Sequence, residues 1–225
     1  MGVDWTGALR VARCSGRREL TRILALHSTP RGPDVAVSRR LSMLLLKRLI
    51  EHTPRVRLIE RDLALECPRH VGAELYLGRQ KLGAERTPAE AQAVRTSNAM
   101  IDQLNWADIL VIGAPMYNFG FPSVLKSWLD NVSIAGRTFR RDRNGRLHGL
   151  VTGKKAYVLT SRGGEFGNGS GEAGNFADSH LRLALDLLGI RNVHVIAADG
   201  QALHPDARRV GFDLAVQRIR ELIPG

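Results

Sequence analysis

The feature that most restricts the fold is a regular alternation of strand-like and helix-like segments along 225 residues. Short apolar or alternating runs predict five strands, at residues 22–27, 55–63, 108–114, 155–161 and 192–198. Longer runs with apolar residues at helical spacing predict five helices, at 37–52, 87–105, 121–132, 175–188 and 205–222. The segment 139–152 is rich in turn residues and predicts a hairpin.

This alternation predicts an α/β fold of three layers, in which helices cover both faces of a five-stranded parallel sheet. Right-handed crossovers favour a doubly wound sheet, and the flavodoxin-like order 2-1-3-4-5 is a natural candidate for five strands. Ligands of such sheets bind beyond the carboxyl ends of the strands, where the order reverses. We therefore expect the site in the loops after strands 1, 3 and 4. Residues 66–86 show no clear period and are expected to form a long functional cover.

Composition indicates the domain organisation and the cellular compartment of the protein. Residues 1–20 are basic and are expected to be a disordered or weakly ordered extension, which leaves 21–225 as one domain. No signal peptide is expected, because an apolar core is missing from that extension. With only Cys14 and Cys67, a structural disulfide is not expected, and a reducing cytoplasm fits. No apolar run of 18 residues occurs, so no membrane span is expected.

The net charge of +11 raises the question of nucleic acid as a partner. No helix-turn-helix, zinc-finger or RNP-type motif accompanies the charge, so no specific nucleic acid is expected. The charge would still attract an anionic cofactor. No histidine stands in a ligand-like spacing, so no metal is expected.

The first loop, residues 28–38, has the features of an anion site. The hydroxyls of Ser28 and Ser38, with the free amides at the start of the following helix, could surround a phosphate group. The alternative is that Ser38 is simply a helix cap. The loop lacks both GxxxxGK[ST] and GxGxxG, which counts against a P-loop and against a dinucleotide-binding Rossmann domain.

The second and third loops have the features of a ring-binding site. In residues 115–120, Met116 and Phe119 offer packing surface to a flat ring, and Asn118 offers a polar amide. The alternative is an ordinary strand-to-helix connection with its aromatics held in the core. In residues 160–164 the paired glycines would let backbone amides approach a ring edge and stabilise negative charge there. The alternative for this loop is a flexible surface segment.

Several segments in order carry a family resemblance. Residues 115–119, Pro-Met-Tyr-Asn-Phe, resemble the PMYNF signature of FMN-dependent NADH-azoreductases, relatives of the NAD(P)H:quinone oxidoreductases in the flavodoxin-like superfamily. Residues 125–139, 149–156 and 160–164 are also similar to that family. The resemblance implies a homodimer with one FMN per subunit near the dimer interface. It also implies a ping-pong cycle, in which NADH or NADPH donates hydride and a quinone or azo compound accepts two electrons.

The resemblance further implies which residues hold the cofactor. Ser28 and Ser38 would help to hold the FMN phosphate. The residues that frame the isoalloxazine would be Pro115, Met116, Tyr117, Asn118, Phe119, Ser161, Arg162, Gly163 and Gly164. Those that shape the substrate pocket would be Tyr117, Asn118, Phe119 and Phe166. No dedicated catalytic acid or base is expected, because the flavin carries the chemistry.

Two departures from the family pattern affect these expectations. Ala36 replaces a serine of the phosphate loop, and backbone amides with Arg39 or Arg40 are expected to compensate. Glu165-Phe166 stands where an apolar residue and a histidine are common, and its carboxylate would repel anionic substrates such as sulfonated azo dyes.

Two other functions stay open at this point. One is a small electron-transfer flavoprotein without pyridine nucleotide chemistry, although such carriers are often acidic and this chain is basic. The other is a flavin-free binding module on the same fold. Flavin colour, and its bleaching by NADH, would separate the three.

Overall fold

The five predicted strands form one parallel sheet. A computed structural model describes residues 10–11, 20–32, 34–166 and 173–224. The strands are β2 (Thr21–His27), β3 (Val56–Asp62), β4 (Ile109–Gly113), β7 (Lys155–Ser161) and β8 (Asn192–Ala198). Their spatial order is β3-β2-β4-β7-β8 and every neighbouring pair is parallel, so the predicted order 2-1-3-4-5 is confirmed.

The N-terminal segment contributes one short element to this sheet. Strand β1 (Arg10–Val11) pairs antiparallel with β3 and so adds a sixth strand at that edge. The expectation of a weakly ordered extension otherwise falls on residues 1–9 and 12–19, which lie outside the described residues. The boundary near residue 20 therefore stays a prediction.

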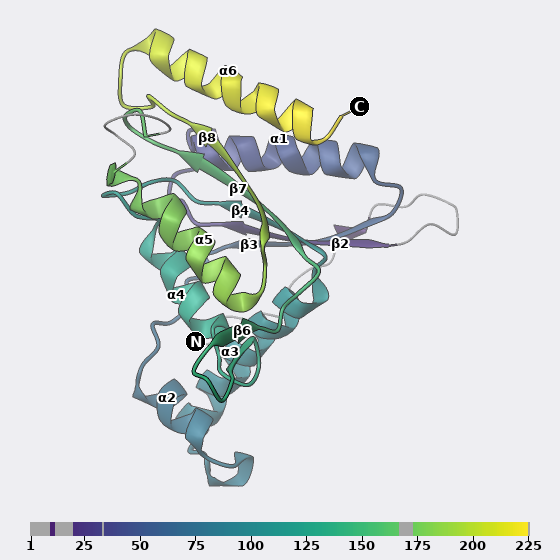
Figure 1. The fold of residues 1–225 in the computed structure, drawn as a ribbon, viewed down its shortest axis with the longest axis vertical. Coiled ribbons are helices and arrows are strands. Elements are labelled where there is room, and N and C mark those ends of the chain that lie inside the picture. The colour runs from purple at the N-terminus through teal and green to yellow at the C-terminus, as the bar shows by residue number, and fades with distance from the viewer. Residues whose placement is uncertain (1–9, 12–19, 33, 167–172, 225) are drawn as a thin grey trace.

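Helices cover both faces of the sheet, as Figure 1 shows. One face carries α1 (Val37–His52) and α6 (Pro205–Leu222), and the other carries α3 (Pro88–Trp106), α4 (Ser123–Val132) and α5 (Phe176–Leu188). Alternate residues of a strand point to opposite faces. Ile23 of β2 accordingly packs in the core under α1 and α6, whereas Leu24 packs in the core under the other three helices.

The helix starts follow the sequence signals in one case and not in another. Before α3, the Thr87 hydroxyl accepts a hydrogen bond from the Glu90 amide at 3.3 Å, and the Glu90 carboxylate accepts one from the Thr87 amide at 2.9 Å. This reciprocal pair is the expected capping box. Helix α1 instead starts after Ala36 without a side-chain cap, and Ser38 lies within its first turn. The interpretation of Ser38 as a simple helix cap is therefore wrong.

The cover contains regular structure that its sequence pattern did not reveal. Residues 66–86 include helix α2 (Ala73–Gln80) and a short 3-10 helix, η1 (Gly83–Glu85). Gly78 lies inside α2, where a Cβ atom would come within 3.0 Å of the Val94 side chain on α3. The glycine that suggested a loop is therefore a point of close helix packing. Few residues of α2 are buried, so its apolar period is weak.

The start of the cover is attached firmly to α4. The Ser127 hydroxyl donates to the carbonyl oxygens of Pro68 and Arg69, at 2.9 Å each. The Asn131 side chain donates to the same Arg69 carbonyl at 2.8 Å. These bonds hold the cover backbone beside the loops at the carboxyl edge of the sheet.

The turn-rich segment forms the expected hairpin of β5 (Phe139–Arg141) and β6 (Leu147–Gly149). Gly145 at its tip has a φ of +80°, which glycine adopts without steric cost. Among the described residues, no helix is both long and apolar enough to pass through a bilayer.

Candidate functional site

The three loops chosen from the sequence meet at one edge of the sheet. They follow β2, β4 and β7, whose carboxyl ends lie side by side (Figure 1). Backbone bonds join them, because the Ser28 amide donates to the Gly113 carbonyl at 3.1 Å and the Met116 amide donates to the Ser161 carbonyl at 2.9 Å. The predicted convergence is what a parallel sheet requires.

Ser28 is fully buried where the first loop leaves β2. Its hydroxyl donates to the Gly113 carbonyl at 2.7 Å, so its proton is engaged in holding the first two loops together. A second link joins Thr29 Oγ1 to the Tyr117 hydroxyl at 3.2 Å. Thr29 has no local sequence signal for this link, because its partner lies 88 positions away in the chain.

The first turn of α1 supplies backbone donors at this edge. The first amides of any helix have no partner within the helix, and the helix dipole adds positive potential there. Ser38 lies buried in this turn. The side chain of Arg39 pairs with Asp62, and the guanidinium of Arg40 lies 4.5 Å from the centre of the Phe212 ring. The expected compensation for Ala36 therefore rests on amides more than on these side chains.

The second loop is a strained two-residue turn. Tyr117 and Gly120 exchange backbone hydrogen bonds of 2.8 and 3.0 Å, and between them Asn118 and Phe119 have φ angles of +49° and +67°. A positive φ is unfavourable for residues with a Cβ atom, and such strain is concentrated at functional sites. The Phe119 side chain is 57% exposed. The alternative of an ordinary connection with its aromatics held in the core is therefore wrong for Tyr117 and Phe119.

The third loop turns its carbonyl groups toward the loop after β8. The carbonyls of Arg162, Gly163 and Gly164 accept from the amides of Gln201, Ala202 and Gly200, at 2.9 to 3.0 Å. The amides of Gly163 and Gly164 donate to no residue that the structure describes. A Cβ atom would lie 3.2 Å from the Ala202 side chain at Gly163, and 3.3 Å from the Phe166 ring at Gly164. Glycine therefore allows this close packing while leaving two donors free.

An aromatic pair joins the second and third loops. The rings of Phe119 and Phe166 are 6.3 Å apart and meet edge to face. Gly174 lies against both, since a Cβ atom there would be 3.4 Å from each ring. Glu165 is exposed beside this pair. Residues 167–172, which follow this pair in the chain, lie outside the described residues.

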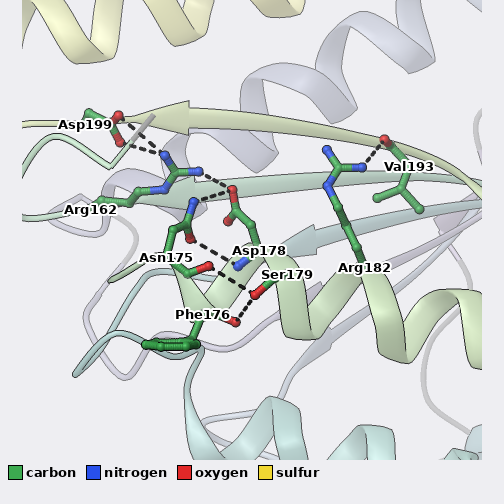
Figure 2. A network of polar contacts seen from close by, with 8 residues as sticks. All are labelled: Arg162, Asn175, Phe176, Asp178, Ser179, Arg182, Val193 and Asp199. Carbon is green, nitrogen blue, oxygen red and sulfur yellow. Dashed lines mark hydrogen bonds and ion pairs between the residues drawn. The ribbon is translucent and has the colours of Figure 1, made fainter. Parts of the chain in front are cut away.

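The side chain of Arg162 has a different environment from the one expected. Its guanidinium is buried and pairs with Asp178 at the start of α5 and with Asp199 after β8, the latter at 3.2 Å (Figure 2). The Asn175 side chain donates to the same Asp178 carboxylate at 3.1 Å. This cluster could not be predicted from a local pattern, because the two aspartates lie 16 and 37 residues from Arg162.

A cavity of about 660 Å³ opens between the first two loops and α4. Tyr117 and Asn118 line it, as do His70 from the cover and Lys126 from α4. Phe119 and Phe166, also assigned to a substrate pocket, are not in the lining of this cavity among the described residues. His70 and Lys126 were not predicted, and they reach the cavity only through the path of the cover and the start of α4.

No metal centre accompanies these groups in the described ranges, where three or more His, Cys, Asp or Glu side chains nowhere gather in a suitable arrangement. The donors at the carboxyl edge are instead backbone amides, with Ser38 and the Asn118 side chain. Such a set suits an anionic group and the polar edge of a flat ring.

Comparison with known proteins places the chain among flavoproteins. A family model described as having the flavodoxin-like fold matches residues 21–223. An FMN-dependent NADH:quinone oxidoreductase of Azospirillum brasilense is 38% identical over 203 residues, covering 89% of this chain and 97% of the relative. The FMN-dependent NADH:quinone oxidoreductase 2 of Rhizobium etli is 34% identical over 207 residues, covering 91% and 98%.

Solved structures give a consistent result. An azoreductase from Bacillus anthracis superposes with a TM-score of 0.84 at 27% identity, covering 91% of this chain and 99% of that one. An FMN-dependent NADH-azoreductase from the same species, crystallised with FMN, has a TM-score of 0.78 at 22% identity, covering 91% and 100%, and supports the fold alone.

Proposed function

Because the chain belongs to the FMN-dependent NADH:quinone oxidoreductase and azoreductase family of the flavodoxin-like fold, we propose that it reduces quinones, and also azo compounds, with electrons from NADH. The observation that carries the proposal is the set of free backbone amides at the carboxyl edge. The amides of Asn118, Phe119, Gly163 and Gly164 donate to no described residue, although they belong to two loops that the fold brings together.

The residues at this edge fit FMN. The first turn of α1, with Ser38, offers donors and positive potential to the phosphate. The exposed turn of residues 117–119 offers aromatic surface to the ring. The free amides of Gly163 and Gly164 would stabilise negative charge at the pyrimidine edge of the ring. When bound, FMN supplies the two-electron chemistry, and we assign no catalytic acid or base to the protein.

The cavity beside the second loop supports a small organic substrate. Its volume of about 660 Å³ lies within the usual range of small-molecule sites, roughly 300 to 1,000 Å³. Tyr117 and Asn118 line the cavity and also belong to the strained turn. We propose that the nicotinamide and the acceptor occupy this region in turn, which is the arrangement a ping-pong cycle needs.

A homodimer and a cytoplasmic location are further parts of the proposal. Large apolar side chains are exposed on α5, at Phe176 and Leu183, on the cover at Tyr76, and just before the cover at Leu65. Exposed apolar surface of this kind marks association sites. Cys67 is a free thiol, which fits a reducing compartment. Light scattering at several concentrations should give twice the monomer mass, and a monomer at all of them would exclude the dimer.

The enzyme proposal is tested by the colour and redox behaviour of the purified protein. We expect absorbance near ~450 nm, bleached by NADH under nitrogen and restored by a benzoquinone. A flavin that NADH leaves oxidised would instead indicate an electron carrier. Protein that stays colourless after incubation with FMN would indicate a flavin-free binding module.

A substitution in the third loop tests the site. In Gly164→Ala the new methyl group would lie 3.3 Å from the Phe166 ring and displace the free amide. We expect FMN to bind about tenfold more weakly, the loss of roughly one hydrogen bond to a charged group. Gly83→Ala is the matched control, because a Cβ atom there meets nothing within 4 Å. Fluorescence titration of both variants measures the effect, and equal affinities would remove the third loop from the site.

A further inference from the structure

We propose that Arg162 is a positioning residue for the flavin and not a residue that touches it. Its guanidinium fixes the third loop to α5 and to the loop after β8, so that the Gly163 and Gly164 amides stay at the ring edge. This inference rests on the proposed FMN function.

The two terminal nitrogens of the Arg162 guanidinium both contact carboxylates, while its buried Nε has no hydrogen-bond partner among the described residues. The side chain is 4% exposed. One terminal nitrogen lies 3.2 and 3.4 Å from the two carboxylate oxygens of Asp199, and the other donates to Asp178 (Figure 2). A guanidinium held by two carboxylates has both ends of its planar fork used in bonding. Both terminal nitrogens therefore bond to the protein in this arrangement rather than to a ligand.

The two carboxylates belong to different structural elements. Asp178 lies in the first turn of α5, where Asn175 caps the helix by accepting from the Asp178 amide at 3.2 Å. Asp199 directly follows β8 and starts the loop that receives the carbonyls of the third loop. Arg162 thus joins three segments through one buried group.

The backbone of Arg162 completes the attachment. Its amide donates to the Ala198 carbonyl and its own carbonyl accepts from the Gln201 amide, at 2.9 Å each. With backbone and side chain both held, Arg162 leaves little freedom to Gly163 and Gly164, which would otherwise be the most mobile residues of the loop. Preorganised amides stabilise developing charge because they need not reorient when it appears.

The same cluster relates the third loop to the second. Helix α5, held by Asp178 at its start, places His180 against the Phe121 ring, with 4.9 Å between the ring centres. Phe121 directly follows the strained turn. Arg162 therefore helps to set the separation of the two loops that we propose to enclose the ring.

The structure offers a matched control in Arg182. Arg182 also fastens α5 to β8, since its guanidinium donates to the Val193 carbonyl at 3.0 Å, but its contacts do not include the third loop (Figure 2). A variant at Arg182 weakens the attachment of α5 alone. A variant at Arg162 weakens that attachment and frees the loop.

The decisive measurement is the flavin midpoint potential of Arg162→Lys beside Arg182→Met in the full-length holoprotein. Lysine keeps the charge but loses the fork. We expect Arg162→Lys to favour reduced over oxidised FMN about tenfold less, a fall of about 30 mV for a two-electron couple. Arg182→Met should keep the wild-type potential. Equal potentials in all three proteins, or equal falls in both variants, would overturn the proposal.

Hydrogen exchange of the flavin-free proteins separates this inference from the proposed function. In Arg162→Lys, amides 163–166 should exchange at least tenfold faster than in wild type, while those of β7 are unchanged. If wild type binds no FMN, the enzyme proposal fails on its own, and this experiment still tests the attachment of the loop. Wild-type exchange in Arg162→Lys would show that the cluster does not hold the loop.

Discussion

The carboxyl and amino ends of the same sheet are built in opposite ways. At the carboxyl end, Asn118 and Phe119 have unfavourable φ angles, and the amides of Gly163 and Gly164 have no described partner. At the amino end, Lys154 donates to the carbonyls of Asn105 and Ala107 at the end of α3. The donors at the carboxyl end are therefore available for a ligand, whereas the Lys154 donor at the amino end is used in a structural contact.

Two pairs of glycines, one at each end, also differ in what a side chain would meet. At the amino end, Gly149 of β6 and Gly189 after α5 bring two backbones together, and a Cβ atom on Gly149 would lie 2.1 Å from the Gly189 nitrogen. At the carboxyl end, a Cβ atom on Gly163 or Gly164 would meet side chains at 3.2 to 3.3 Å. Substitutions at the two ends should therefore affect different properties, which the following experiments measure.

The largest effect is expected at the amino end, from Gly149→Ala. Its methyl group would overlap backbone atoms, which cannot move aside as a flexible side chain could. We expect the free energy of unfolding to fall by about 3 kcal/mol, the upper part of the range for overpacking. Urea denaturation measures this fall, and FMN affinity at low temperature should not change. Weaker FMN binding by the folded variant would contradict the view that the amino end affects stability alone.

A smaller and opposite effect on stability is expected at the carboxyl end, from Phe119→Gly. Glycine removes the strain of a φ of +67°, and the lost ring is more than half exposed. The free energy of unfolding should stay the same or rise by up to about 1 kcal/mol, while FMN should bind about tenfold more weakly without the ring. Asn118→Gly keeps the ring and relieves the neighbouring strain, so it should change FMN affinity less. A clear loss of stability in Phe119→Gly would show that packing of the Phe119 ring stabilises the turn by more than the strain at this residue costs.

The pH dependence of stability offers a test of the amino end. Burial lowers the pKa of Lys154, and Arg22 lowers it further, while Asp108 raises it. Between that lowered value and the ordinary value of 10.5, the unfolded chain binds more protons than the folded chain. The free energy of unfolding should therefore rise with pH in this window. In Lys154→Met the rise should disappear, whereas Lys126→Met, at an exposed lysine, should keep it.

The smallest effect is expected from Lys126→Ala, at an exposed ion pair beside the cavity. Lys126 bonds Asp130 at 2.7 Å on the surface of α4, and such pairs contribute about 0.3 to 0.5 kcal/mol to stability. Thermal melting should change little. Because Lys126 lines the cavity, KM should rise for a sulfonated quinone and stay constant for a neutral one. An equal rise for both quinones would show that the cavity does not distinguish charge.

Most of the fold could be predicted from local sequence patterns in particular elements. The continuous apolar run in β2 records burial on both faces of the sheet and the helical stripe in α1 records which of its faces is buried, and the bounds of α1, β7, β8 and α6 agree with the prediction. Helix α2 was not predicted because only Leu75 and Gly78 are buried in it, although Gly78 packs closely against α3. A surface helix of this kind has too few buried positions to show a period.

The candidate site could be predicted from the sequence only in part. The residues of the three loops were named correctly as neighbours, since parallel strands end at one edge. The sign of φ at Asn118 and Phe119 could not be predicted, because it depends on how Tyr117 and Gly120 close the turn. His70 and Lys126 were also not predicted to line a cavity, since their place beside it depends on the bonds that hold the cover to α4.

By itself, the sequence determined the layers, the strand order and the edge at which we expect a ligand, since burial is recorded in the apolar pattern of the strands and of the helices that pack on the sheet. Only the tertiary structure decided what Arg162 does. The motif at residues 160–164 predicted that Arg162 frames the cofactor ring. In the folded protein its side chain instead pairs with Asp178 and Asp199. A buried charge needs partners, and these partners lie 16 and 37 residues away in the chain, in segments that only the tertiary structure brings to Arg162.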